Sequence, residues 1–245
     1  MPPLSAADVL RLWEAGTSLT PAGRALAILA AASPGMPASE LAALPVGRRD
    51  RRLLEVRREA FGSGLDAVVP CPACGERIEF RLDAARLLDG DDRRAAESDA
   101  ELTAGEWRVR YRMPTAGDLA EAADCEAPER ALALLVERCV IEATRAGEPA
   151  APAEIPAAAL ALMDQELARR DALAEILLDF VCPGCSAAGQ APFDIARYLW
   201  EELRAEAARL LREVHALARA YGWREADILA LSAVRRQAYL ELAPS

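Results

Sequence analysis

Cys71-Pro-Ala-Cys74-Gly is followed much later in the chain by Cys182-Pro-Gly-Cys185, and these two stretches decide the fold. A Cys-x-x-Cys turn presents two thiolates to one metal ion, and its backbone amides can hydrogen-bond the sulfurs. Two such turns supply the four ligands of a closed tetrahedral shell. The sequence therefore predicts one structural Zn²⁺ ion bound by Cys71, Cys74, Cys182 and Cys185.

The residues after each cysteine pair repeat the same pattern. The first pair is followed by Phe80 and Asp83-Ala-Ala-Arg-Leu-Leu, and the second by Phe193 and Asp194-Ile-Ala-Arg-Tyr-Leu. Both stretches are typical of a cysteine knuckle followed by a strand and then a helix. Two similar knuckles that face one another form a zinc ribbon, so we expect the two pairs to meet.

Two other uses of the cysteine pairs are less compatible with the sequence. A thioredoxin-like redox pair needs a strand before it and a helix directly after it in a βαβ unit, which neither pair has. A catalytic zinc would leave one coordination position for water, whereas four cysteines fill the shell. The remaining Cys125 and Cys139 lie in expected helices without a second motif, and we expect them to pack in the interior.

Composition predicts a folded, helix-rich protein. The 245 residues are 53% hydrophobic and 28% charged but only 5% aromatic, and alanine and leucine supply most of the apolar share. The net charge of −10 opposes binding to phosphate backbones and anionic lipid surfaces. We therefore expect neither nucleic acid nor membrane as a partner.

The sequence shows no membrane-spanning or export signal. Arg24, Arg138 and Arg170 interrupt the most apolar stretches, and Met1 to Ser5 is not a basic segment before an apolar core. We expect a cytoplasmic protein, and in that reducing compartment six cysteines favour metal binding over a disulfide framework.

The first part of the chain, from about 4 to 60, reads as helices. Ser5 and Thr20 are expected N-caps, and Pro21 suits the first helical position. The last of these helices, from about Arg48 to Phe61, is rich in arginine and stops at Gly62. Its basic residues can form a solvent-exposed face, which is the commoner outcome and the one we expect, or a docking face: Arg49, Arg51, Arg52, Arg57 and Arg58.

The rest of the chain mixes strands and helices. The following expectations come from periodicity and from the positions of proline and glycine: a hairpin from 65–70 and 78–82, a polar loop over 89–101, a strand over 107–113, helices starting at 115–118 and over 128–143, a linker over 147–156, a helix over 157–170, an apolar segment over 173–181, and a helical region over 195–242 broken at Gly222.

Together these patterns predict a mainly α protein with a small β zinc-ribbon element, an α+β fold whose helical N- and C-terminal units are joined through the four-cysteine zinc site. We expect three parts: a helical N-terminal unit over 1–64, a zinc-ribbon-like core over 65–194 with an inserted strand and helices, and a C-terminal helical module over 195–245.

The sequence contains no catalytic constellation that we can recognise, and it predicts a non-enzymatic protein without a small-molecule substrate. The single histidine, His215, lies on an amphipathic stretch and is expected to pack or to be partly exposed. Glu201 and Glu202 are expected on a helix surface. Nucleophile motifs and phosphate-binding glycine loops are absent from the sequence.

Three stretches resemble the T-even phage baseplate hub assembly chaperone family, which is encoded in contractile phage tail and contractile injection system clusters. The resemblance rests on these residues: Gly47-Arg-Arg-Asp50, Leu53-Leu54, Arg57 and Phe61-Gly62; Cys71-Pro-x-Cys-Gly75 with Glu79-Phe80; and Glu213 to Trp223 with Glu225, Ile228-Leu229, Leu231, Arg235-Arg236 and Tyr239-Leu240. It implies an assembly chaperone or minor component whose partners are baseplate, hub or spike proteins.

The C-terminal part of that resemblance carries an apolar stripe around Gly222, which predicts a helical hairpin. The stripe can pack within its own domain, which is the commoner outcome, or dock another protein. Our hypothesis for docking is a helix-in-groove contact through Trp223, Ile228 and Tyr239.

A second function class remains open. The knuckles and the arginines near 48–58 are compatible with a zinc-ribbon adaptor in transcription or RNA metabolism, although the acidic net charge opposes it.

Overall fold

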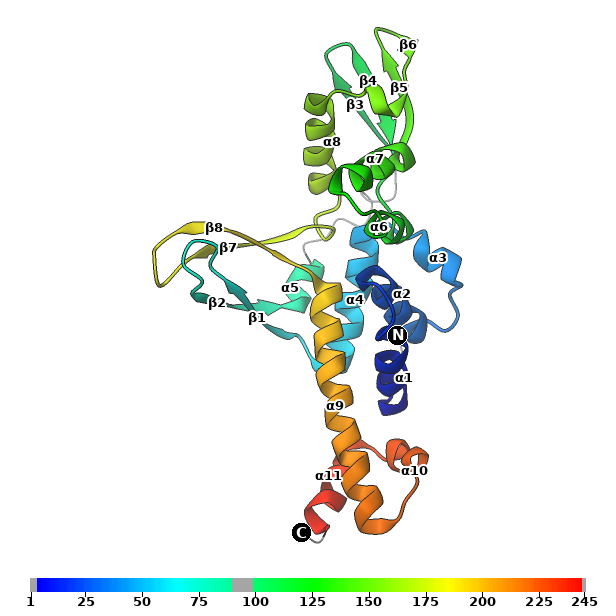
Figure 1. Cartoon of the computed structure of the whole chain (residues 1–245), viewed down its shortest axis with the longest axis vertical. Helices are drawn as coiled ribbons and strands as arrows, with labels where there is room; N and C mark the ends of the chain where they lie inside the picture. The colour runs from blue at the N-terminus through cyan, green and yellow to red at the C-terminus, as the bar shows by residue number, and fades with distance from the viewer. Residues whose placement is uncertain (1–3, 90–98, 244–245) are drawn as a thin grey trace.

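The computed structural model describes residues 4–89 and 99–243. Within these ranges, 11 helices and small antiparallel sheets form a mixed α+β fold, as predicted. Figure 1 shows a helical body with a pair of β-hairpins, a small inserted unit and a C-terminal module projecting from it. No helix in these ranges is long and apolar enough to cross a bilayer.

The body consists of N-terminal helices packed on the first half of the longest helix. Its elements are α1 (Ala6–Gly16), α2 (Pro21–Ala32), α3 (Ala38–Ala42), α4 (Val46–Phe61) and α9 (Ile195–Tyr221). Ser5 and Thr20 cap α1 and α2, and Pro21 starts α2, as predicted. Ile28, Leu53 and Leu203 are fully buried in this core.

The expected solvent-exposed arginine face of α4 is wrong. Arg49, Arg51 and Arg57 are only 7%, 8% and 4% exposed, because α4 lies in the middle of the body. Arg57 donates to both carboxylate oxygens of Glu202 on α9, at 2.9 and 2.7 Å, so Glu202 is not an ordinary surface residue either. Arg51 donates to the carbonyl of Leu88 at 2.9 Å. These guanidinium groups hold the fold together.

A buried aspartate on α4 makes stability depend on pH. Asp50 is 6% exposed beside Arg49, and burial raises its pKa to about 6 from the ordinary 3.8. A raised pKa means that the folded state prefers the protonated acid. The contribution of Asp50 to stability is therefore complete below its pKa in the unfolded chain, and it is lost as the pH rises through about 6. The loss corresponds to roughly 3 kcal/mol.

Asp50→Asn is therefore expected to remove this decrease in stability with rising pH. The difference in free energy of unfolding between variant and parent should shift in favour of the variant by up to roughly 3 kcal/mol between about pH 4 and about pH 7.5, because only the parent titrates. Urea unfolding at both pH values measures the difference. Asp66→Asn, whose side chain is 87% exposed, is the control. If the variant instead became less stable than the parent as the pH rises, the ion pair between ionised Asp50 and Arg49 would outweigh the cost of burying the carboxylate.

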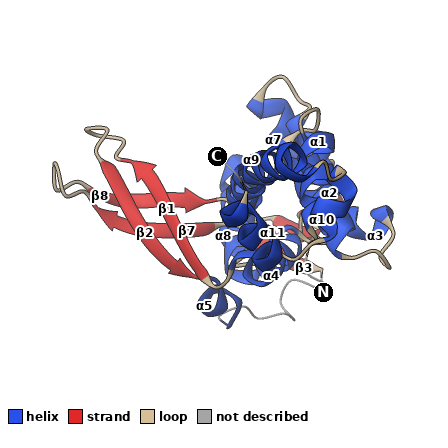
Figure 2. Cartoon of the chain, turned by 90° about the horizontal axis from the view of Figure 1, so that it is seen from below, coloured by secondary structure: helices blue, strands red, loops and turns tan. Residues whose placement is uncertain are grey.

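Two antiparallel hairpins leave the body side by side, as Figure 2 shows. The first pairs β1 (Gly64–Pro70) with β2 (Arg77–Asp83), and the second pairs β7 (Ile176–Val181) with β8 (Ala188–Phe193). Helix α5 (Ala84–Asp89) follows β2, and α9 follows β8. The repeated order of knuckle, strand and helix is thus confirmed. The bases of both hairpins pack in the body core through Leu65, Leu178 and Phe193.

The inserted unit lies between the hairpins in sequence and has its own core, around Val109, Tyr111 and Met163. Its four-stranded antiparallel sheet has the order β3-β4-β5-β6. Its elements are β3 (Ala100–Ala104), β4 (Trp107–Tyr111), α6 (Ala116–Ala123), α7 (Pro128–Cys139), β5 (Val140–Arg145), β6 (Glu148–Pro149), the 3₁₀ helix Pro152–Glu154 and α8 (Ala157–Arg170).

Three expectations for this unit need correction. The helix expected over 128–143 ends at Cys139, because Val140 and Ala143 pair with β4 as part of β5. The linker expected over 147–156 contains β6 and a 3₁₀ helix. Of the loop expected over 89–101, residues 90–98 lie outside the described residues, and Ala100 already belongs to β3.

The C-terminal module is the helical hairpin that the sequence predicted. Helix α9 ends at Gly222, whose φ of 68° is left-handed, and α10 (Glu225–Ala230) and α11 (Ala233–Leu242) fold back on it. The division into 1–64, 65–194 and 195–245 stays a prediction. The buried clusters join the first half of α9 to the N-terminal helices and leave a separate cluster around Leu217 and Ile228.

Candidate metal centre

The two cysteine turns follow the same backbone path. In the first, the amide of Cys71 donates to the carbonyl of Glu76 at 2.7 Å, and the amide of Gly75 donates to the carbonyl of Cys71 at 2.8 Å. The second turn repeats both bonds, from Cys182 to Ala187 at 2.8 Å and from Ser186 to Cys182 at 2.9 Å. Each turn therefore holds its two cysteines at one end of a hairpin.

A left-handed residue follows the second cysteine of each turn. Gly75 has a φ of 78°, and Ser186 occupies the matching position with a φ of 60°. Glycine adopts this conformation freely, whereas a side chain makes it strained. Sequence reasoning singled out Gly75 but missed Ser186. The alignment of the two knuckles was the signal that could have found it.

Ser186→Gly is expected to stabilise the protein by about 0.5–1 kcal/mol, because the relief of left-handed strain exceeds the entropy that glycine adds to the unfolded chain. Gly75→Ala should destabilise it by about 1–2 kcal/mol for the opposite reason. Thermal unfolding of the metal-loaded protein measures both. A loss of stability in Ser186→Gly would show that the serine side chain contributes something that its backbone conformation does not reveal.

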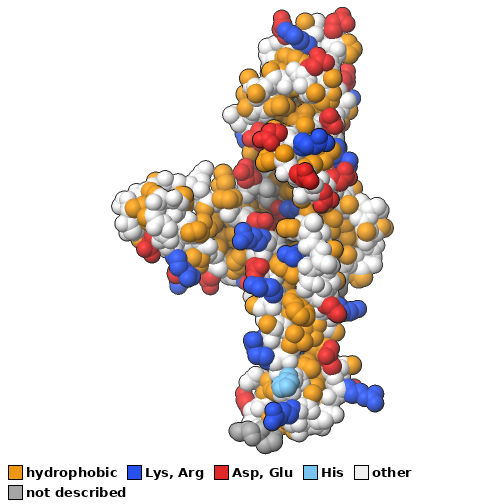
Figure 3. Space-filling model, in the orientation of Figure 1, with side chains coloured by type: hydrophobic (Ala, Val, Ile, Leu, Met, Phe, Trp, Pro, Cys, Tyr) orange, Lys and Arg blue, Asp and Glu red, His pale blue; other side chains and the backbone are white. Residues whose placement is uncertain are grey.

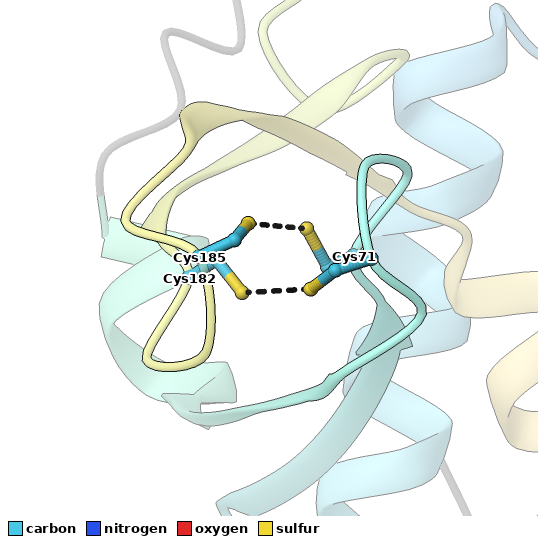
Figure 4. A group of neighbouring side chains, drawn as sticks. Cys71, Cys182 and Cys185 are labelled. Carbon is cyan, nitrogen blue, oxygen red and sulfur yellow. Dashed lines mark hydrogen bonds between the residues drawn. The ribbon is translucent and has the colours of Figure 1, made fainter.

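The four sulfurs of the knuckles come together, as predicted. All four Sγ atoms lie within 4.8 Å of one another, and Figure 4 shows the sulfurs of one turn facing those of the other. Cys71 and Cys185 are separated by 3.8 Å between sulfurs, and Cys74 and Cys182 by 3.6 Å. These distances are far longer than the roughly 2.05 Å of a disulfide. They match the roughly 3.8 Å expected between thiolates that are about 2.3 Å from one tetrahedral ion.

The centre has a buried side and an exposed side. Cys71 and Cys182 are 2% and 1% exposed, while Cys74 and Cys185 are exposed. Ile78, Phe180 and Ala191 pack behind the buried pair in a small cluster of their own. Gly184 lies against the side chain of Glu76, where an added Cβ would be 3.3 Å from it. A larger residue at this position would therefore require the Glu76 side chain to shift by a few tenths of an ångström.

The pKa values of these thiols indicate that a bound cation is needed before all four can be ionised. Hydrogen bonds from the amides of Ala73 and Cys74 lower the pKa of Cys71 to about 7. Although the amide of Glu76 lowers it, the sulfurs of Cys185 and Cys182 raise the pKa of Cys74 to about 12. Four thiolates this close repel one another, so all four ionise together only around a positive charge. The arrangement could therefore hold a metal ion.

Comparison of the chain with protein-family models, curated proteins and solved structures found no match.

The residues expected to contact a partner lie in the C-terminal module. Ile228 is 0% exposed, so its side chain cannot contact another protein while the module is folded, and its place in the docking hypothesis is corrected. Trp223 and Tyr239 are half-buried in one aromatic cluster, with Trp223 stacked on Tyr221 at 4.7 Å and 4.8 Å from Tyr239 between ring centroids. Packing within the chain thus accounts for most of the stripe.

The other cysteines and the histidine lie apart from the metal centre. Cys139 is 2% exposed and packs in the interior, as expected, whereas Cys125 is half-buried. Burial raises the pKa of Cys139 to about 11, which disfavours its thiolate. His215 is exposed on α9. None of these three belongs to a group of metal-binding side chains found among the described residues.

Proposed function

We propose that the four cysteines hold one structural Zn²⁺ ion, and that the chain is a non-enzymatic factor that helps to assemble the baseplate or hub of a contractile tail or injection system. The observation that carries the metal assignment is the set of four sulfurs within 4.8 Å of one another. Four thiolates leave no coordination position for a substrate, and this is the pattern of a structural zinc ion.

The role of such an ion would be to hold together the two hairpins, β1–β2 and β7–β8, which we call the arm. Each hairpin is a two-stranded sheet of its own, and a two-stranded hairpin is marginally stable in water. Beyond their bases, the hairpins meet at the small cluster behind the sulfurs and where Gly184 lies against Glu76. An ion bound by both knuckles would therefore fix the direction of the arm relative to the body.

The assembly role rests on the sequence resemblance and is supported by the shape of the chain. The hairpin arm, the inserted unit and the C-terminal module project from one helical body, which leaves much surface for partners (Figure 1). The face of the arm shown in Figure 3 is mostly uncharged. On the arm, Leu177 and Val181 are 43% and 69% exposed and lie on the same outward face of β7. Exposed apolar residues on one face of a strand are available to a partner protein.

The alternative function, a zinc-ribbon adaptor in transcription or RNA metabolism, rested on the knuckles and on the arginines near 48–58, and the arginines no longer support it. The arginines near 48–58 were the only basic cluster offered for nucleic acid, and three of them are buried in contacts within the chain. Nucleic-acid binding depends mainly on exposed basic groups. A gel shift with DNA and RNA at physiological salt is therefore expected to show weak binding, and tight, salt-sensitive binding would favour the adaptor.

Co-expression tests the assembly role. The tagged chain is produced together with the baseplate, hub and spike proteins of a contractile-tail gene cluster from the same genome, and complexes are isolated by size-exclusion chromatography. We expect a defined complex with at least one of these proteins. Val181→Asp on the arm should weaken it, while Val234→Asp on α11 is the control, since this valine is 81% exposed against 69% for Val181. Absence of any complex with these proteins would contradict the assembly role without affecting the metal assignment.

A further inference from the structure

A small pocket lies where the inserted unit joins the helical body. Its volume is about 190 Å³, and its apolar lining includes Val46 at the start of α4, Met113 after β4, Leu119 on α6 and Leu167 on α8. The chain leaves the unit along this pocket, between the end of α8 and Glu175. Hydrogen bonds from Val46 to the carbonyl of Pro114 and from Ala116 to the carbonyl of Leu44 fasten the two parts beside it. We name it the junction pocket.

The mouth of the junction pocket is acidic. Asp164 and Glu175 line it, both exposed, and neither has a hydrogen bond or ion pair with another described residue. Asp171 lies deeper, at 4% exposure, and accepts the amide of Gly47 at 2.9 Å. A Cβ at Gly47 would fall 1.6 Å from that carboxylate, so only glycine lets it approach. Among the described residues that line the pocket, none is basic.

Size and charge together define the occupant. Cofactor and drug-sized ligands occupy pockets of roughly 300–1,000 Å³, so this pocket is suited to a single side chain. An apolar floor below carboxylates complements the methylene stem and the charged head of a basic residue. A guanidinium group can bond two carboxylate oxygens at once, which an ammonium group cannot do in the same planar way.

We propose that the junction pocket binds one arginine side chain presented by a partner protein. The stem would lie along Met113 and Leu167, and the guanidinium would contact Asp164 and Glu175. Because the pocket is lined by Val46 of the body together with Leu119 and Leu167 of the unit, the bound side chain would also favour one position of the unit relative to the body. The inference depends neither on the metal nor on the contractile-tail assignment.

The test uses the methionine at the pocket as a reporter. The full chain with ¹³C-labelled methionine methyl groups is titrated with N-acetyl-arginine amide, and with the neutral citrulline derivative of the same shape. We expect the Met113 signal to move with saturation for arginine and not for citrulline, while Met36 and Met163 stay in place. Equal responses to both compounds, or no response at Met113 at millimolar arginine, would overturn the proposal.

Variants separate the pocket from a general charge effect. Asp164→Asn with Glu175→Gln should weaken arginine binding about tenfold or more, since charge-assisted bonds are lost. Glu79→Gln with Glu137→Gln removes the same charge at exposed sites away from the pocket and should leave binding unchanged. Ala168→Leu should block the pocket without a change at Met36. Equal affinity in the two double variants would contradict the assigned contacts.

Discussion

Replacing any one of Cys71, Cys74, Cys182 and Cys185 by serine is expected to abolish stoichiometric metal binding and to loosen both hairpins together. The reason is that each cysteine supplies one ligand of a shared site. Metal binding contributes on the order of 10–16 kcal/mol in zinc-finger peptides, far more than the small cluster behind the sulfurs can replace. The bases of the hairpins should stay ordered, because Leu65 and Phe193 pack in the body core.

Hydrogen exchange followed by mass spectrometry measures this effect segment by segment. In each variant we expect faster exchange over 68–80 and 180–191, and unchanged protection in α2 and in the first half of α9. Cys125→Ser is the control, because this cysteine lies outside the metal centre. If a variant of the first knuckle loosened only its own hairpin while the other kept its metal, the two knuckles would be separate sites.

Asp118→Asn is expected to destabilise the protein by about 3–5 kcal/mol, because it breaks a buried ion network. Asp118 is 0% exposed and accepts from Arg112, at 2.5 and 3.0 Å, and from Arg138, at 2.5 Å. It also accepts the amide of Thr115 at 2.8 Å, which closes the N-terminus of α6. One carboxylate thus joins the residue that follows β4 to α6 and α7.

The pH dependence of this network has the opposite sign to that of Asp50. Burial raises the pKa of Asp118, but the bonds from Arg112, Arg138 and Thr115 outweigh it and hold the pKa well below its usual range. The contribution is therefore complete above the unfolded pKa and is lost only as the pH falls through the lowered value. Urea unfolding at neutral pH, with Asp124→Asn as an exposed control, measures the loss. A loss below about 1 kcal/mol would show that the network adds little net stability.

The meeting of the four cysteines could be predicted because its information is local. Each Cys-x-x-Cys turn sets the positions of two sulfurs by itself, and the repeat of knuckle, strand and helix indicated that the turns form a pair. Helix caps such as Ser5 and Thr20 were predictable for the same reason, since a cap bonds within its own turn.

Features that depend on distant partners could not be predicted in this way. Arg57 is buried in a contact with Glu202, which lies 145 positions away in the sequence. The local sequence of α4 contains no pattern that predicts this contact. Val140 continues the helical pattern of α7 equally well, and only pairing with Tyr111 makes it a strand residue. Ile228 belongs to an amphipathic stripe whose spacing is the same whether it faces its own core or a partner.

The most direct test of the central claim is the metal content of the chain purified without chelator, measured by native mass spectrometry together with elemental analysis. A single four-thiolate site predicts one zinc ion per chain. Two metal ions per chain would contradict the single-site account. So would a metal-free protein that does not bind added zinc when its thiols are reduced.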